Sequence, residues 1–260
     1  MGAMAREANT MIKENPIKTT LAAGKASVGG WLNLGSPLAA EVLGGIGVPW
    51  MTVDCEHTPF DMNLTAHTFR AIEARGAIPL VRAWDHDVST ISRLLDAGAW
   101  GVVIPHVSTP EQAATFASAT RYPPRGTRSV GTSRCITLGD TNEYYNVFND
   151  RVLCIPQIED MEGIGNAQAI AEIPDVDIGF LGPNDLSRSM GAAMGSDAHE
   201  KALADFREGC AAAGKPCGIP VNSGAIAKQR IAEGFSFISI ANDLKLMREK
   251  ADIEFEGFLE

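Results

Sequence analysis

The chain lacks the features of a nucleic-acid-binding, membrane or secreted protein. Its 260 residues carry 22 Lys and Arg against 32 Asp and Glu, which gives a formal net charge of −10. No basic run is present, so nucleic acid and anionic membranes are disfavoured as partners. No apolar stretch is long enough to span a bilayer, and the start lacks the apolar core of a signal peptide. We therefore expect a cytoplasmic protein.

Metal-binding and nucleotide-binding motifs are missing as well. The five cysteines are odd in number and scattered, which argues against a disulfide framework and for a reducing compartment. The sequence holds no CxxC pair and no HExxH segment, so we expect no closed zinc site. Neither G-x-G-x-x-G nor G-x-x-x-x-G-K-[ST] follows the first expected strand, and this disfavours a nucleotide-binding sheet.

Lysine is absent between residues 26 and 200. Barrel enzymes that act on ketoacids often hold the substrate as a Schiff base on a lysine borne by a strand. Here Lys215 precedes an expected strand, and Lys245 follows the last one in what looks like the first turn of a helix. We therefore expect no Schiff-base lysine.

Short apolar runs alternate along the chain with Ala-rich segments of helical spacing. Continuous apolar strands separated by helices indicate a parallel sheet, and eight of them favour a single-domain α/β fold, the (β/α)8 TIM barrel. We expect an N-terminal extension and first helix over 1–27, the barrel over 28–252 and a C-terminal tail over 253–260. The eight runs are 29–34, 50–57, 78–84, 101–107, 152–159, 177–183, 217–222 and 237–243.

The longest irregular region, 120–150, follows the fourth unit and is too long for an ordinary connection. We expect it to contribute to the active site or to a subunit contact.

Polar side chains gather where the expected strands end. The reactive face of such a barrel is the rim where strands end and helices begin. Glu159 and Asp185 follow neighbouring strands, and two carboxylates placed in this way can bind one hard divalent cation. The polar residues at or just past strand ends are Asn33, His57, Arg82, His106, Gln157, Glu159 and Asp185.

Alternation along the strand that ends near residue 57 places His57 and Glu56 on opposite faces. If His57 faces the barrel mouth, Glu56 points outward, so we favour His57 for chemistry. Each candidate also has an ordinary explanation. Arg82 could serve as a structural ion-pair partner, Glu159 could begin a helix favoured by the dipole, and Asp185 could cap the next helix. Their shared place at one rim favours a functional site.

Six segments resemble the HpcH/HpaI aldolases, which are metal-dependent pyruvate aldolases of the class II type. The resemblance runs in order from about residue 28 to residue 250, and its most specific parts are the YPPxGxRxxG loop and the GPxDLS segment. The segments are GGWLNLGSPLAAEVLGGIGVPWMTVDCEH, PLVRAW, LLDAGAWGVVIPHV, ATRYPPRGTRSVG, IPQIED and LGPNDLSRSMG.

The resemblance implies roles for the catalytic and metal-binding residues. Glu159 and Asp185 would hold a divalent ion, Mg2+, Mn2+ or Co2+. His57 would be the general base, paired with Asp96, and Arg82 would contact the ketoacid oxygen. Such a set suits retro-aldol cleavage, because an oriented histidine can take a hydroxyl proton while a Lewis acid and an arginine stabilise the enolate.

The resemblance also implies the substrate-binding residues. Trp31 would lie near the pocket and Gln157 would support the metal site. Gly182, with its neighbours Pro183 and Asn184, would cradle the substrate carboxylate through backbone N–H groups. Two positions depart from the family pattern, since Cys55 stands where a small glycine is frequent and His106 where an apolar residue is expected.

The implied activity is reversible aldol cleavage of a 4-hydroxy-2-oxo acid to pyruvate, or hydroxypyruvate, and an aldehyde. The implied assembly is a homo-hexamer, a trimer of dimers with exchanged terminal helices. Three alternatives stay open: a citrate-lyase-like or malyl-CoA-type lyase, which would need a basic groove for CoA; an oxaloacetate decarboxylase; and a non-catalytic ketoacid-binding subunit.

Overall fold

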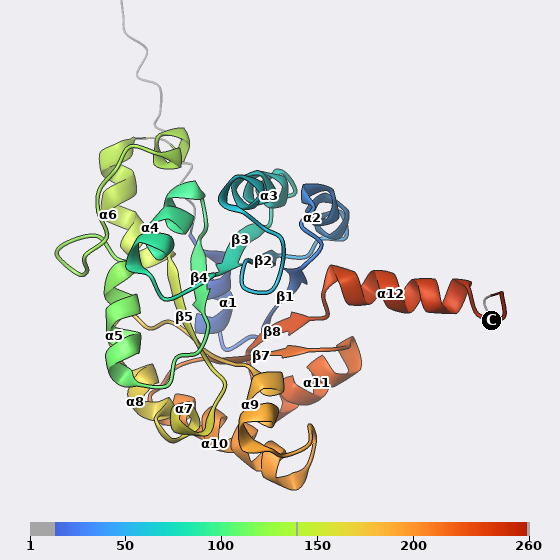
Figure 1. Cartoon of the computed structure of the whole chain (residues 1–260). Helices are drawn as coiled ribbons and strands as arrows, with labels where there is room; N and C mark the ends of the chain where they lie inside the picture. Colours follow the sequence, from blue (N-terminus) through green and yellow to red (C-terminus); the bar gives the residue numbers. More distant parts are fainter. Residues whose placement is uncertain (1–13, 139, 259–260) are drawn as a thin grey trace, which may run out of the picture.

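Eight parallel strands close into a barrel in the computed structural model, which describes residues 14–138 and 140–258 (Figure 1). Each strand pairs with its neighbours in the sequence, and β8 closes on β1. The expected TIM barrel is confirmed, and each expected apolar run overlaps a strand. The strands are β1 (Ser27–Leu32), β2 (Trp50–Asp54), β3 (Ile78–Arg82), β4 (Gly101–Ile104), β5 (Leu153–Ile158), β6 (Gly179–Leu181), β7 (Cys217–Val221) and β8 (Phe237–Ile240).

Helices surround the barrel and return the chain from the end of one strand to the start of the next. Within the described residues, none of them is long and apolar enough to cross a bilayer. The helices are α1 (Pro16–Ala22), α2 (Pro37–Gly44), α3 (Met62–Ala74), α4 (Val88–Ala97), α5 (Pro110–Ala119), the 3-10 helix η1 (Arg134–Leu138), α6 (Thr141–Arg151), α7 (Met161–Gly165), α8 (Ala167–Glu172), α9 (Pro183–Met190), α10 (Asp197–Ala212), α11 (Gly224–Glu233) and α12 (Asp243–Glu254).

Aromatic side chains fill the interior of the barrel. Trp50 stacks on Phe237 with ring centroids 4.3 Å apart, and Trp31 stacks on Phe180 at 5.8 Å. Gly29 makes room for this packing, because a Cβ atom built there would lie 2.1 Å from the ring of Trp50. The barrel is therefore a packed core and its chemistry is confined to the mouth.

The predicted irregular region 120–150 is partly helical, since it contains η1 and α6. Asp140 caps α6 by accepting hydrogen bonds from the backbone N–H groups of Asn142 and Glu143, and the helix buries Tyr144 and Phe148. The region connects the end of α5 to the start of β5, so within one chain it lies at the rim where strands begin. In its described part, Arg121 contacts Asp177 and Arg128 contacts Asp96 at that rim, and a role in the active site or in a subunit contact stays a prediction.

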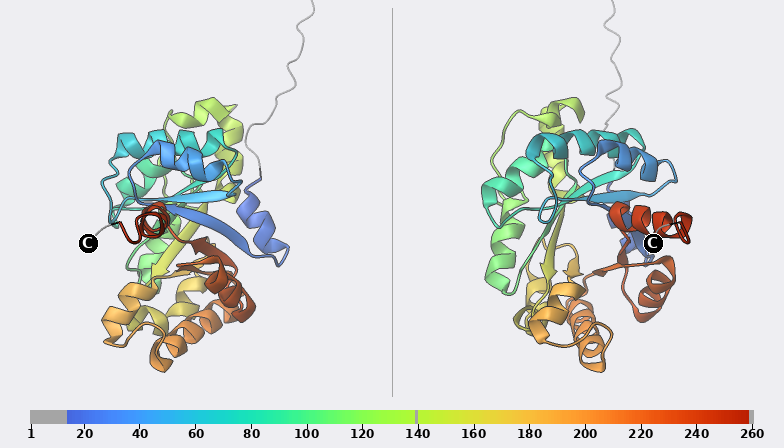
Figure 2. Two further views of the ribbon diagram at one scale, coloured as in Figure 1. Left: turned by 90° about the vertical axis from the view of Figure 1, so that its right-hand side faces the viewer. Right: turned by 45° about the vertical axis from the view of Figure 1, so that its right-hand side comes forward.

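The first helix packs against the barrel, whereas the last helix projects from it. Ile17 of α1 is 1% exposed and belongs to the same buried cluster as Trp50 and Phe237. The expected first helix is thus present and packs against the barrel, whereas residues 1–13 of the expected extension lie outside the described residues. The last helix, α12, projects away from the barrel (Figures 1 and 2). Its side chains Met247 and Ile253, and Phe255 directly after the helix, are more than half exposed.

Candidate active site

The candidate site lies at the rim formed by the carboxyl ends of the strands. β2 ends at Asp54 and β3 at Arg82, and these two residues are register partners in the sheet. His106 follows β4, Glu159 follows β5 and Gly182 follows β6. Because neighbouring parallel strands end side by side, residues distant in the sequence meet here.

Arg82 is held by a buried carboxylate. Its Nε donates to Asp54 Oδ1 at 2.9 Å, and its Nη2 donates to Asp54 Oδ2 at 2.6 Å. Burial alone would raise the pKa of Asp54, but the hydrogen bonds and charge of Arg82 outweigh it and hold that pKa below its usual range. The guanidinium also lies 5.3 Å from the ring centroid of Trp31. These contacts fix Arg82 at the mouth.

Glu56 points into the site, so the predicted outward orientation is wrong. The reason is local: β2 ends at Asp54, whose Oδ1 accepts a hydrogen bond from the backbone N–H of Glu56 at 3.1 Å. Strand alternation therefore no longer applies at residues 55–57. The Glu56 carboxylate is 2.9 Å from Arg82 Nη1 and 3.0 Å from His106 Nε2. His57 also faces the mouth region, with its side chain 60% exposed and its Nε2 3.6 Å from Glu56 Oε2.

His106 links the ends of β2 and β5. Its φ angle is +52°, in the left-handed region that histidine tolerates better than most residues. Its backbone N–H donates to Glu159 Oε1 at 2.7 Å, and its Nδ1 lies 2.9 Å from the same oxygen. The sequence analysis noted His106 as a departure from the family pattern, but the contacts of its ring with Glu56 and Glu159 could not be predicted.

Glu159 is the buried acidic group of the site. Its second oxygen, Oε2, accepts a hydrogen bond from Gln157 Nε2 at 2.5 Å. Burial raises the pKa of Glu159, and the negative charge of Asp185 raises it further, although donors from Gln157 and His106 act in the opposite direction. Asp185 itself is exposed in the first turn of α9. A raised carboxylate pKa next to a second carboxylate is what a cation would relieve.

The donor set fits a divalent ion that also binds substrate. Glu159 and Asp185 offer hard oxygen ligands, and Gln157 Oε1 is buried without a hydrogen-bond partner among the described residues. Within the same part of the chain, no three His, Cys, Asp or Glu side chains group to enclose a metal. The protein would therefore supply two carboxylates, and the remaining positions stay open to water and substrate, as catalytic metals require.

A cavity of about 190 Å3 opens at this rim. Its polar lining comes from the ends of several strands, including two amide side chains that were not predicted. Asn222 follows β7 and Asn242 follows β8, so their position after a strand was the signal that could have found them. The predicted residues that line the cavity are Trp31, Asn33, Arg82, Pro183 and Asn184, whereas His57, Gln157, Glu159 and Asp185 are not part of its lining. Gly182 lies beside Glu159, with no room for a Cβ atom.

The predicted pairing of His57 with Asp96 is not formed within one chain. Asp96 lies in the last turn of α4, which runs from the mouth back to the rim where strands begin. There its Oδ1 accepts a hydrogen bond from Arg128 Nη2 at 2.6 Å. The carboxylate beside the His57 ring in this chain is Glu56.

Both lysines considered from the sequence contact groups outside the candidate site. Lys215 Nζ donates to the carbonyl oxygen of Val176 at 2.6 Å, just before β6, at the rim opposite the mouth. Lys245 is in the first turn of α12, as predicted, and its Nζ lies 2.5 Å from Glu249 Oε1. The expectation of chemistry without a lysine Schiff base rests on these positions.

Comparison with known proteins places the chain among aldolases. The profile of the HpcH/HpaI aldolase/citrate lyase family matches residues 27–249. A hydroxypyruvate/pyruvate aldolase of Rhizorhabdus wittichii is 37% identical over 241 residues, covering 91% of this chain and 96% of that protein. A 5-keto-4-deoxy-D-glucarate aldolase of Salmonella arizonae is 35% identical over 244 residues, covering 92% and 95%.

A solved structure gives the same result. The crystal structure of an HpcH/HpaI aldolase/citrate lyase family protein from Burkholderia cenocepacia superposes with a TM-score of 0.89 at 31% identity, over 94% of this chain and 99% of that one. Both the sequence profile and the superposition extend over nearly the whole barrel. The chain therefore belongs to the HpcH/HpaI aldolase/citrate lyase family, as a carbon–carbon lyase.

Proposed function

We propose that the protein catalyses the metal-dependent, reversible aldol cleavage of a 4-hydroxy-2-oxo acid to pyruvate, or hydroxypyruvate, and an aldehyde. The observation that carries the proposal is the buried Glu159 carboxylate, whose pKa is raised by burial and by Asp185, at the same rim as Arg82. Related proteins that act on hydroxypyruvate and pyruvate, or on a keto-deoxy sugar acid, support this substrate class.

Glu159 and Asp185 would hold Mg2+, Mn2+ or Co2+. When bound, such an ion acts as a Lewis acid toward the 2-oxo group. His57 takes the proton of the C4 hydroxyl on its ring nitrogen. The C3–C4 bond then breaks, the aldehyde forms, and the electron pair passes into the enolate of the ketoacid. Arg82 stabilises the negative charge that develops on oxygen, and loss of one such donor typically costs about 3 kcal/mol.

The first experiment separates metal catalysis from Schiff-base catalysis. A chelator should abolish cleavage, and added Mg2+, Mn2+ or Co2+ should restore it. Borohydride added with pyruvate should leave the enzyme active, because no lysine imine forms to be reduced. Turnover that survives complete removal of metal, or inactivation by borohydride, would contradict the proposal. A panel of aldehydes with each ketoacid then identifies the natural pair, with oxaloacetate tested for decarboxylation.

Two variants separate the roles of base and metal ligand. His57→Gln should lower the rate of cleavage by about 10²–10⁴-fold, the usual contribution of a positioned base, with Mn2+ affinity unchanged. Asp185→Asn should weaken Mn2+ binding itself, because it removes one of two charged ligands. Both effects are measured by steady-state kinetics and by Mn2+ titration. An equal loss of bound Mn2+ in the two variants would contradict the assigned roles.

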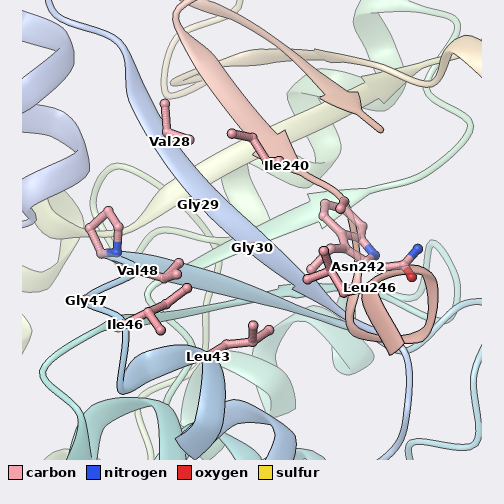
Figure 3. A pocket seen from close by; sticks show the side chains of 13 residues that line it. Val28, Gly29, Gly30, Leu43, Ile46, Gly47, Val48, Ile240, Asn242 and Leu246 are labelled. Carbon is pink, nitrogen blue, oxygen red and sulfur yellow. The ribbon is translucent and has the colours of Figure 1, made fainter. Parts of the chain in front are cut away.

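We also propose that the enzyme is a homo-hexamer, a trimer of dimers in which α12 is exchanged. The support is an apolar cavity of about 420 Å3 on the barrel wall beside α12 (Figure 3). Its lining includes Val28 of β1, Leu43 of α2, Ile46 just after α2, and Leu246 of α12. Ile46 is 78% exposed in a single chain. A helix of a second copy would cover this surface and bury the exposed face of α12.

Light scattering after size-exclusion chromatography tests the assembly. Ile46→Asp should reduce the native mass. The free-energy cost of burying a carboxylate in an apolar contact exceeds the stabilisation gained by burying the surrounding apolar surface. Ile226→Asp is the matched control, since Ile226 of α11 is also exposed but does not line the cavity. A monomeric wild-type protein, or an unchanged mass for Ile46→Asp, would refute helix exchange.

A cytoplasmic location is part of the same proposal. All five cysteines are free and buried. Burial raises the pKa of Cys55 and Cys154 to about 12, which keeps these thiols protonated and unreactive at neutral pH. Free thiols suit a reducing compartment, and fractionation of the source cells tests the assignment.

A further inference from the structure

A continuous chain of polar contacts joins Arg82 to Glu159. Arg82 Nη1 lies 2.9 Å from Glu56 Oε2, and Glu56 Oε1 lies 3.0 Å from His106 Nε2. The other ring nitrogen of His106, Nδ1, is 2.9 Å from Glu159 Oε1. Thus each ring nitrogen of His106 contacts one carboxylate. The imidazole connects the end of β3, with Arg82, to the end of β5, with Glu159, through Glu56.

The two oxygens of Glu159 have different surroundings. Oε1 faces the β4 side, where the backbone N–H and the ring of His106 both contact it. Oε2 faces the β6 side, since the position of a Cβ atom on Gly182 would be only 2.3 Å from it. Gly182 leads directly into α9, which carries Asp185. Contacts from His106 on Oε1 and the hydrogen bond of 2.5 Å from Gln157 Nε2 on Oε2 therefore fix the carboxylate together, with Oε2 on the side of Gly182.

We propose that His106 is a positioning residue: with Glu56 behind it, its ring fixes the Glu159 carboxylate in the orientation that receives the cation, and so makes cation affinity depend on Glu56. This inference rests on the proposed metal-dependent function. Hydrogen bonds to metal-ligating carboxylates orient them, and loss of such a partner typically costs 10–100-fold in metal affinity. His106 is more than half exposed, so its ring can be replaced without opening the core.

Substitutions at position 106 can separate the two ring contacts. His106→Phe keeps the size and planarity of the ring and removes both nitrogens. His106→Asn keeps a donor at the place of Nδ1, next to Glu159, but cannot reach Glu56. His106→Gln can reach Glu56 but has no donor at the place of Nδ1. All three variants keep the backbone N–H that contacts Glu159, but the φ angle of +52° at residue 106 suits Asn better than Phe or Gln. The melting temperature of each variant is therefore measured beside its Mn2+ affinity, and the cycle with Glu56 below separates the ring contacts from backbone strain.

The experiment is a Mn2+ titration of the full-length protein without substrate, with free Mn2+ followed by electron paramagnetic resonance. His106→Phe and His106→Gln should each weaken Mn2+ binding about 10-fold. His106→Asn should recover only part of the affinity, to about the level of Glu56→Gln in the wild-type background, because it keeps the contact with Glu159 but not the link to Glu56. His67→Phe is the matched control, because His67 is an exposed histidine of α3 whose contact is Arg70, and its affinity should stay at the wild-type value.

A double-mutant cycle tests the dependence on Glu56. Glu56→Gln should weaken Mn2+ binding in the wild-type background, because His106 loses its second carboxylate. The same change should have no further effect in His106→Phe or His106→Asn, since the link is already broken. A general structural role for His106 would instead leave the effect of Glu56→Gln unchanged in these backgrounds.

The outcomes are distinct. If the wild-type protein binds no Mn2+, the proposed function fails and the inference fails with it. If wild type binds Mn2+ but His106→Phe binds it equally well, the inference alone is overturned, as it is when the effects of Glu56→Gln and His106→Phe add. Partial rescue by Asn together with loss of the Glu56 effect supports it.

Discussion

Removing the Arg82 guanidinium should cost the fold as well as the reaction. In Arg82→Met the stem of the side chain is kept, but Asp54 loses the two hydrogen bonds of 2.9 Å and 2.6 Å that neutralise it. The Asp54 side chain is only 1% exposed, and the side-chain donor it keeps, Asn33 Nδ2 at 2.9 Å, carries no charge to neutralise it. Breaking a buried ion pair by removing one partner typically costs about 3–5 kcal/mol. We expect a loss of that size in the free energy of unfolding at pH 7, measured in urea.

Two comparisons identify the buried charge as the cause. Arg82→Met combined with Asp54→Asn should be less destabilised than the sum of the single changes, because the unpaired charge is gone. Arg75→Met is the surface control: Arg75 and Glu41 are 3.0 Å apart, but both are more than two-fifths exposed, so the change should cost about 0–1 kcal/mol.

The pH dependence has a definite sign. Because the folded pKa of Asp54 is below its unfolded value of about 3.9, the ion pair contributes fully above that pH and its contribution is lost as the pH falls through the folded pKa. The gap between wild type and Arg82→Met should thus be largest near neutrality and narrow in acid. Equal stability of the two proteins at pH 7, or a gap that Asp54→Asn leaves intact, would refute the reasoning.

Three glycine substitutions give further predictions. Gly29→Ala should lower the melting temperature, because its Cβ atom would lie 2.1 Å from the ring of Trp50, whereas Gly30→Ala in the same strand meets its nearest atom at 3.5 Å and should be tolerated. Gly182→Ala should weaken Mn2+ binding, because the added Cβ atom would lie 2.3 Å from Glu159 Oε2 and would displace that oxygen. The circular dichroism spectrum should stay unchanged. Normal Mn2+ affinity in Gly182→Ala would mean that this oxygen does not face the cation.

Much of the architecture could be predicted from periodicity alone. Eight apolar runs separated by helical segments specify a parallel barrel, and the polar residues after those runs specify the rim. The helix α6 was missed because its segment shows little apolar periodicity, and it is stabilised by packing of Tyr144 and Phe148 against the rest of the fold.

The details of the site depended on where strands end and on contacts between distant segments. Alternation failed at Glu56 because β2 stops two residues earlier, and no pattern in the sequence marks that point. The partners of His106 come from two other strand ends, so they follow only from the closed barrel. Asp96 pairs with Arg128, 32 residues away, through a connection whose path the sequence does not specify.

The aromatic stack fills the barrel interior in the described part of the chain, so reactants enter and leave through the mouth. Under the proposed reaction, the ketoacid half sits deepest, beside the buried Glu159, and the aldehyde half lies toward His57 and solvent. The aldehyde, which lies nearer to solvent, then has to dissociate before the ketoacid can leave. Cleavage should accordingly obey an ordered sequence, with the aldehyde leaving first and the ketoacid alone competing with the starting compound for the empty enzyme.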